Sequence, residues 1–103
     1  MDAQLKRGIL KICILQLLEK EDRYGYDIIK TVQKYFSDTD ESTIYAILRR
    51  LYKEGLTDIY LSEKSHGPQR KYYKINGKGV KCLNADISAW KEIEFVFHEL
   101  GID

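Results

Sequence analysis

Apolar residues in the first half of the chain recur at the spacing of α-helices. Residues 4–19 predict a first helix whose apolar arc is wider than the single stripe of a surface helix. A second helix is expected over residues 25–36, followed by a polar turn at 37–40. A third helix begins near Ser42 and ends at Gly55, which suits the left-handed position after a last helical turn.

The periodicity changes from 3.6 to 2 residues after Gly55. Residues 57–62 and 70–75 alternate and are rich in tyrosine and isoleucine, which favour β-strands. The polar segment 63–69 closes them into a two-stranded hairpin. We interpret Asn76 as the N-cap of a final helix, because a helical pattern rather than a third strand follows it.

The final helix is expected over residues 77–100, which is long for so small a domain. Its apolar residues follow the 3-4-3 spacing of a helix that packs along another helix, and the series shifts to a new face after Glu94. The far half has too little domain left to pack on, so we expect a second copy of the chain to cover it. The expected dimer contacts on the final helix are Val80, Leu83, Ile87, Trp90 and Phe97. The first helix either is central to the core or faces a core on one side and a partner on the other, and in the second case its expected dimer contacts are Leu5, Ile9 and Ile12.

This order of elements predicts a mostly α (α+β) fold. The expected architecture is a winged helix-turn-helix with a two-stranded wing and a long C-terminal dimerisation helix. We expect residues 1–76 to form the winged-helix part, including the N-terminal helix, and residues 77–103 to form the dimerisation helix. The two parts should form one compact unit.

The composition indicates a globular protein of a reducing compartment. The chain has 103 residues, of which 44% are hydrophobic and 32% charged. Its apolar runs are too short to span a bilayer, and the N-terminus lacks the features of a secretory signal. Cys13 and Cys82 lie in separate helical patterns, which fits buried thiols better than a disulfide. We therefore expect a cytoplasmic protein without membrane partners.

The formal net charge is only +1, but basic residues concentrate in the middle of the chain. Residues 41–78 hold eight basic and four acidic side chains, whereas residues 79–103 hold two basic and five acidic ones. A local excess of positive charge over a helix and a hairpin is typical of a surface that binds nucleic acid. It also occurs on ordinary solvated faces, so charge alone does not decide the function.

The third helix and the hairpin carry side chains suited to double-stranded DNA. Ser42 and Thr43 at the helix start could reach phosphates or base edges, and Arg49 could hydrogen-bond two acceptors on guanine. The hairpin would lie along the adjacent backbone. Its candidate contacts are Lys64, Gln69, Arg70 and Lys71. The alternative is a winged-helix module that binds proteins and not DNA, for which neutral or mixed residues on this face would be typical.

Signals of catalysis or metal binding are weak. His66 and His98 belong to no cluster with metal-ligand spacing, and no glycine-rich phosphate loop is present. No serine or cysteine has a neighbouring base at motif spacing. We expect neither an enzyme nor a bound cofactor or metal.

Several motifs together resemble PadR-type regulators, in the short subfamily with a single C-terminal helix. They are Leu5-Lys6-Arg7-Gly8-Ile9-Leu10, Tyr24-Gly25-Tyr26-Asp27-Ile28, Ser42-Thr43-Ile44-Tyr45, Leu48-Arg49-Arg50-Leu51, Glu54-Gly55-Leu56, the wing 67–73, and Gly79, Leu83 and Trp90. The resemblance implies a homodimer with interlocked first and last helices, and repressor-like binding to a pseudo-palindromic operator. Ala46 replaces a proline common in the family, and Asn76 replaces a threonine.

The resemblance also implies roles for individual residues. Tyr45 and the Thr43 hydroxyl would contact phosphates or bases with Tyr26 nearby, and Arg70 and Lys71 would serve as wing contacts. Tyr45 could instead pack into the core beside Leu48. In short members that sense drugs, a tryptophan of the last helix binds flat aromatic molecules; Trp90 falls at that position, with Phe97 as a neighbour. The alternative for Trp90 is a purely structural place in the dimer core.

Overall fold

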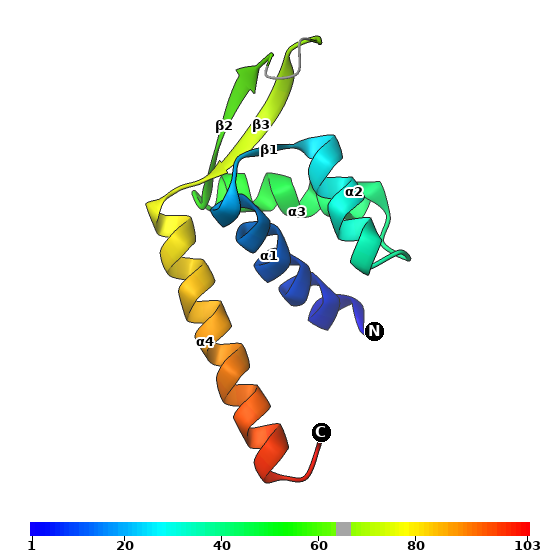
Figure 1. Cartoon of the computed structure of the whole chain (residues 1–103), viewed down its shortest axis with the longest axis vertical. Helices are drawn as coiled ribbons and strands as arrows, with labels where there is room; N and C mark the ends of the chain where they lie inside the picture. The colour runs from blue at the N-terminus through cyan, green and yellow to red at the C-terminus, as the bar shows by residue number, and fades with distance from the viewer. Residues whose placement is uncertain (64–66) are drawn as a thin grey trace.

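The computed structural model describes residues 1–63 and 67–103 of the chain, so Lys64 and His66 lie outside the described residues. The elements are α1 (Ala3–Lys20), β1 (Arg23–Tyr24), α2 (Gly25–Tyr35), α3 (Glu41–Lys53), β2 (Thr57–Ser62), β3 (Arg70–Ile75) and α4 (Gly77–Glu99). As Figure 1 shows, the first three helices lie together and the hairpin projects from them. Helix α4 starts at the base of the hairpin and runs in the opposite direction. The predicted winged helix-turn-helix with its long last helix is confirmed.

The strands form an antiparallel sheet in the order β1-β3-β2. The wing hairpin β2–β3 has the predicted bounds, with Thr57 opposite Ile75 and Ser62 opposite Arg70. The additional strand β1 pairs Arg23 with Tyr73 and Tyr24 with Tyr72. The sequence did not predict this strand, because two residues are too few to show an alternating pattern.

The predicted end of α3 at Gly55 and the predicted start of α4 at Asn76 are both observed. Gly55 follows α3 with a φ of 77°, the left-handed conformation that glycine adopts without strain. Asn76 caps α4, its side-chain oxygen accepting a hydrogen bond from the Gly79 amide at 2.9 Å. Gly55 thus ends α3 before the hairpin, and Asn76 begins α4 directly after it.

The core lies between α1, α2, α3 and the sheet. Its most deeply buried side chains are Leu10, Ile14, Leu15, Ile28, Ile44, Leu48 and Leu51. Leu83 of α4 belongs to the same core and is only 1% exposed. Leu83 is therefore covered within the protomer, and its predicted contribution to a dimer seam stays a prediction.

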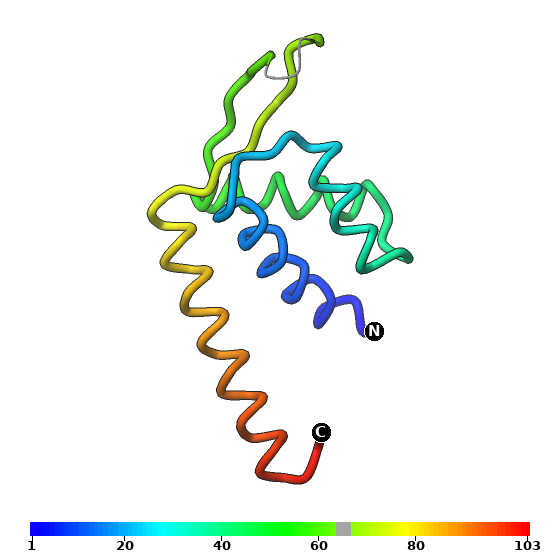
Figure 2. The backbone as a smooth tube through the Cα atoms, viewed as in Figure 1, coloured from blue at the N-terminus to red at the C-terminus, as the bar shows by residue number. Residues whose placement is uncertain are grey.

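The far half of α4 leaves the body of the molecule. Figure 2 shows the helix extending past α1, with the C-terminus well below the other elements in that view. All residues from 91 to 100 are exposed, and the molecule measures 52 × 30 × 21 Å along its principal axes. Within the described ranges, none of the helices has the length and apolar character needed to cross a membrane.

Candidate nucleic-acid interface

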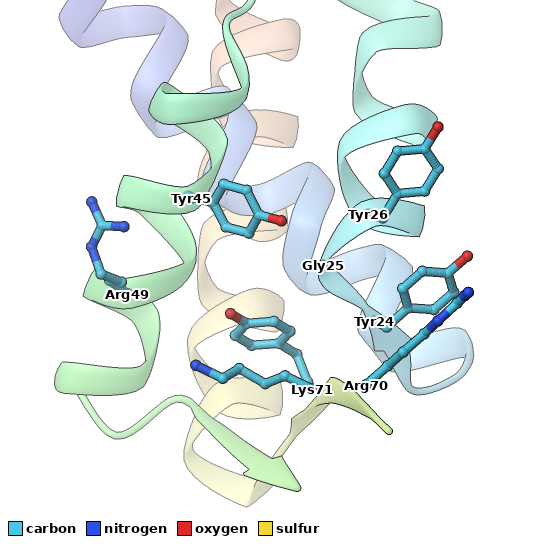
Figure 3. A pocket seen from close by; sticks show the side chains of 8 residues that line it. Tyr24, Gly25, Tyr26, Tyr45, Arg49, Arg70 and Lys71 are labelled. Carbon is cyan, nitrogen blue, oxygen red and sulfur yellow. The ribbon is translucent and has the colours of Figure 1, made fainter. Parts of the chain in front are cut away.

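A cavity of about 700 Å³ opens between the start of α2, the outer face of α3 and strand β3. Its lining combines aromatic and basic side chains with one glycine, as Figure 3 shows. The lining residues are Tyr24, Gly25, Tyr26, Tyr45, Arg49, Arg70, Lys71 and Tyr73. Since no carboxylate belongs to this set, the cavity favours an anionic guest.

Tyr45 stands at the edge of this cavity, 37% exposed and outside the core formed by the neighbouring turns of α3. Its ring lies against Gly25, where an added Cβ would come within 3.1 Å of the Tyr45 Cε1 atom. Any larger residue at the start of α2 would displace the ring. The structure therefore favours the exposed position that a phosphate or base contact requires over packing of Tyr45 into the core beside Leu48.

Three cations surround the cavity from two elements. Arg49 comes from α3, whereas Arg70 and Lys71 come from the first two positions of β3 (Figure 3). None of the three forms an ion pair with a carboxylate in the part of the chain that the structure describes. Their charge is therefore available to a ligand, which is the property that a phosphate-binding surface requires.

Tyr73 is a cavity residue that the sequence analysis did not name. Burial raises the pKa of its hydroxyl, and the nearby Tyr45 adds to the rise, whereas Arg49 opposes it. The Tyr73 hydroxyl therefore stays protonated at neutral pH and can donate a hydrogen bond to an anion. The sequence offered no signal, because a tyrosine in a strand normally indicates packing.

The structure brings some of the predicted DNA contacts together and separates others. Tyr26, Tyr45, Arg49, Arg70 and Lys71 share the cavity. Ser42 and Thr43 are exposed at the first turn of α3, and Gln69 is exposed just before β3. These three residues do not line the cavity. Lys64 lies outside the described residues.

The candidate ligand residues lie on the other side of the molecule. Trp90 lines two shallow grooves between α1 and α4, of about 330 and 200 Å³. The smaller groove is formed with Ile9, Ile12 and Cys13. Phe97 lines neither groove and is 44% exposed two turns farther along α4. Within one protomer, Trp90 thus shares these grooves with the predicted dimer residues of α1, but Phe97 does not line them.

In the described part of the chain, no three His, Cys, Asp or Glu residues lie close enough together to hold a metal ion. Cys13 and Cys82 are free thiols, and burial raises the pKa of Cys13.

Comparisons with known proteins agree with this geometry. The family model of the PadR-like transcriptional regulators matches residues 14–85. An uncharacterized protein X of Lysinibacillus sphaericus is 34% identical over 91 residues, which are 85% of this chain and 84% of that protein. The crystal structure of a PadR-like transcriptional regulator from Bacillus cereus is 34% identical, with a TM-score of 0.86 over 95% of this chain and 96% of that one. A PadR family transcription regulator from Clostridium difficile is 35% identical, with a TM-score of 0.80 over 88% of this chain and 96% of that one.

Proposed function

The chain belongs to the PadR-like family of transcriptional regulators, and from this premise we propose that it is a homodimeric, sequence-specific DNA-binding repressor of the cytoplasm. The observation that carries the proposal is the cavity beside α3, in which three cations that have no carboxylate partner among the described residues meet tyrosine hydroxyls. Phosphodiesters match this chemistry, because charged and hydroxyl donors bind phosphate oxygens irrespective of sequence.

Sequence readout would come from the exposed face of α3. With the wing on the backbone, the first turn of this helix enters the major groove, and Ser42 and Thr43 reach base edges or phosphates. Arg49 lies two turns farther along the same helix and also lines the cavity, so it connects readout with backbone binding. Two copies related by a two-fold axis would select a pseudo-palindromic operator, with half-sites about one helical turn or a multiple apart.

The experiment that tests this function is a selection from random duplex DNA, followed by titration of the selected site at several salt concentrations. We expect a palindrome, nanomolar affinity and a steep dependence on salt. Arg70→Ala and Lys71→Ala should each flatten the slope of log K against log salt by about 1.8, because the homodimer loses two phosphate contacts worth about 0.9 each. Lys74→Ala, at an exposed position of the same strand outside the cavity, should leave the slope unchanged. Weak binding without sequence preference would favour the protein-interaction alternative.

We also propose that the grooves at Trp90 accept a flat aromatic effector that releases the DNA. Trp90 lines an apolar groove together with Ile9 and Ile12 and is only half-buried, so part of the indole surface is accessible for stacking. A second copy of the chain would close the site. Quenching of Trp90 fluorescence by a planar aromatic dye, with loss of operator binding in parallel, is the expected result. Quenching that leaves operator affinity unchanged would remove the regulatory role.

A further inference from the structure

Four tyrosine rings follow one another from the start of α2 across the sheet. Neighbouring ring centroids lie 6.4 Å apart for Tyr26 and Tyr24, 5.7 Å for Tyr24 and Tyr72, and 5.6 Å for Tyr72 and Tyr60. At the far end, the Tyr60 hydroxyl donates to the carboxylate of Asp22, which directly precedes β1. This tyrosine row joins the wing to the helix-turn-helix.

A cation lies over one of these rings at the edge of the candidate DNA-binding cavity. The Arg70 guanidinium carbon is 4.5 Å from the centroid of the Tyr24 ring. Figure 3 shows the Arg70 side chain running alongside that ring. Strand pairing explains the contact: Tyr24 is opposite Tyr72, and Arg70 lies two residues before Tyr72, on the same face of the sheet.

The type of partner matters for what Arg70 can bind. A carboxylate partner would occupy the guanidinium N–H donors and cancel much of the charge. An aromatic face attracts the cation through its quadrupole and leaves the in-plane N–H groups free for phosphate oxygens. Arg70 is the first residue of β3, so without the ring its long side chain would sample many rotamers.

We propose that Tyr24 is a positioning residue for DNA binding, which holds the Arg70 guanidinium in the orientation that receives a backbone phosphate. The proposal rests on the proposed DNA-binding function and adds a residue that does not itself have to touch DNA. It also gives the two-residue strand β1 a role, because β1 is the element that brings Tyr24 over the face of β3.

A double-mutant cycle with Arg70 tests the proposal. Tyr24→Ile keeps strand propensity but removes the aromatic face, and Tyr24→Phe keeps the face but removes the hydroxyl. We expect Tyr24→Ile to weaken operator binding by the homodimer about 5- to 25-fold, because each of the two protomers loses an exposed cation–π contact equivalent to about two- to fivefold. Tyr24→Phe should bind like the wild type, and Tyr24→Ile should have no further effect in an Arg70→Ala background.

Two results would overturn the positioning role while leaving the proposed function intact. One is wild-type affinity for Tyr24→Ile. The other is an equal loss with and without Arg70, which would mean that Tyr24 acts through the fold or through a contact of its own. Far-ultraviolet circular dichroism checks that each variant is folded; if Tyr24→Ile is not, Tyr24→Met replaces it in the same cycle. Failure of the wild-type chain to select any operator would instead refute the proposed function.

Discussion

The two halves of α4 have the same secondary structure but opposite surroundings. In the first half, Gly79 and Leu83 are buried against the protomer, and side chains at the helix start hydrogen-bond to the end of α3. In the second half every residue from 91 to 100 is exposed. This exposed half nevertheless has an apolar stripe at helical spacing, formed by Ile93, Val96, Phe97 and Leu100. The first half of the helix thus packs within the protomer, and we expect the distal stripe to pack against a second copy of the chain in the homodimer proposed above.

The comparison separates changes that should affect folding from changes that should affect association. A substitution near the start of α4 should lower the free energy of unfolding of the protomer. A substitution on the distal stripe should leave the protomer folded and weaken the contact with a second copy.

The largest effect is expected at Gly79. A Cβ on this residue would lie 2.2 Å from the Leu56 carbonyl oxygen and 2.7 Å from Cγ1 of Ile75, so the helix start would have to move. We expect Gly79→Ala to lower the free energy of unfolding by about 3 kcal/mol, measured by urea denaturation. Gly77→Ala is the matched control, because nothing lies within 4 Å of its added Cβ. A loss below about 1 kcal/mol at Gly79 would mean that α4 is not held tightly to the protomer.

The second effect concerns Phe97 on the distal stripe. Phe97→Ser should raise the dimer dissociation constant by at least about 30-fold, since burying a phenylalanine side chain contributes about 2 kcal/mol. Sedimentation equilibrium measures this change, and circular dichroism should show an unchanged fold. Phe95→Ser is the control, because Phe95 is similarly exposed but points to the opposite side of the helix. Equal effects of the two variants would contradict a specific seam on the stripe.

The third effect is the loss of the α4 cap. Asn76 accepts a hydrogen bond from the Gly79 amide, and its amide group donates to the Gly55 carbonyl at 2.9 Å. Asn76→Ala should cost about 1 kcal/mol of unfolding free energy, the usual value of an N-cap. Asn84→Ala, at an exposed position inside the helix, should be neutral or slightly stabilising. A smaller loss for Asn76 than for Asn84 would show that the cap is dispensable.

Much of this fold could be predicted from local patterns. The strands Thr57–Ser62 and Arg70–Ile75, the left-handed Gly55 and the Asn76 cap each depend on a few neighbouring residues, and the sequence alone therefore indicated them. Strand β1 could not be predicted, because it exists only through its pairing with β3, some 48 residues away. Leu83 shows a similar limit, because helical spacing indicates which side of a helix is apolar but not that the protomer itself covers this side chain.

The candidate site divides in the same way. Arg49, Arg70 and Lys71 were indicated by their charge, and Tyr45 by the family resemblance. Gly25 and Tyr73 join the cavity only through the packing of α2, α3 and β3 against one another. Tyr24 lacked a sequence signal for its contact with Arg70, because that contact depends on the register between β1 and β3.

The smallest effect is expected at Lys78, which contacts the end of α3 from the start of α4. The Lys78 ammonium donates to the Glu54 carbonyl at 2.8 Å, at the C-terminal end of α3 where a positive charge also interacts favourably with the helix dipole. Lys78→Met keeps most of the aliphatic stem and should cost about 0.5 kcal/mol of unfolding free energy at low salt, and less at 1 M salt. Lys81→Met, also exposed on α4, should cost less because its charge lies farther from that terminus. Equal losses for the two lysines would mean that Asn76 and Gly79 alone hold the start of α4 against the end of α3. A loss specific to Lys78 would mean that its hydrogen bond to Glu54 also holds the two helices together, so that the distal half of α4 extends from a firmly attached helix start.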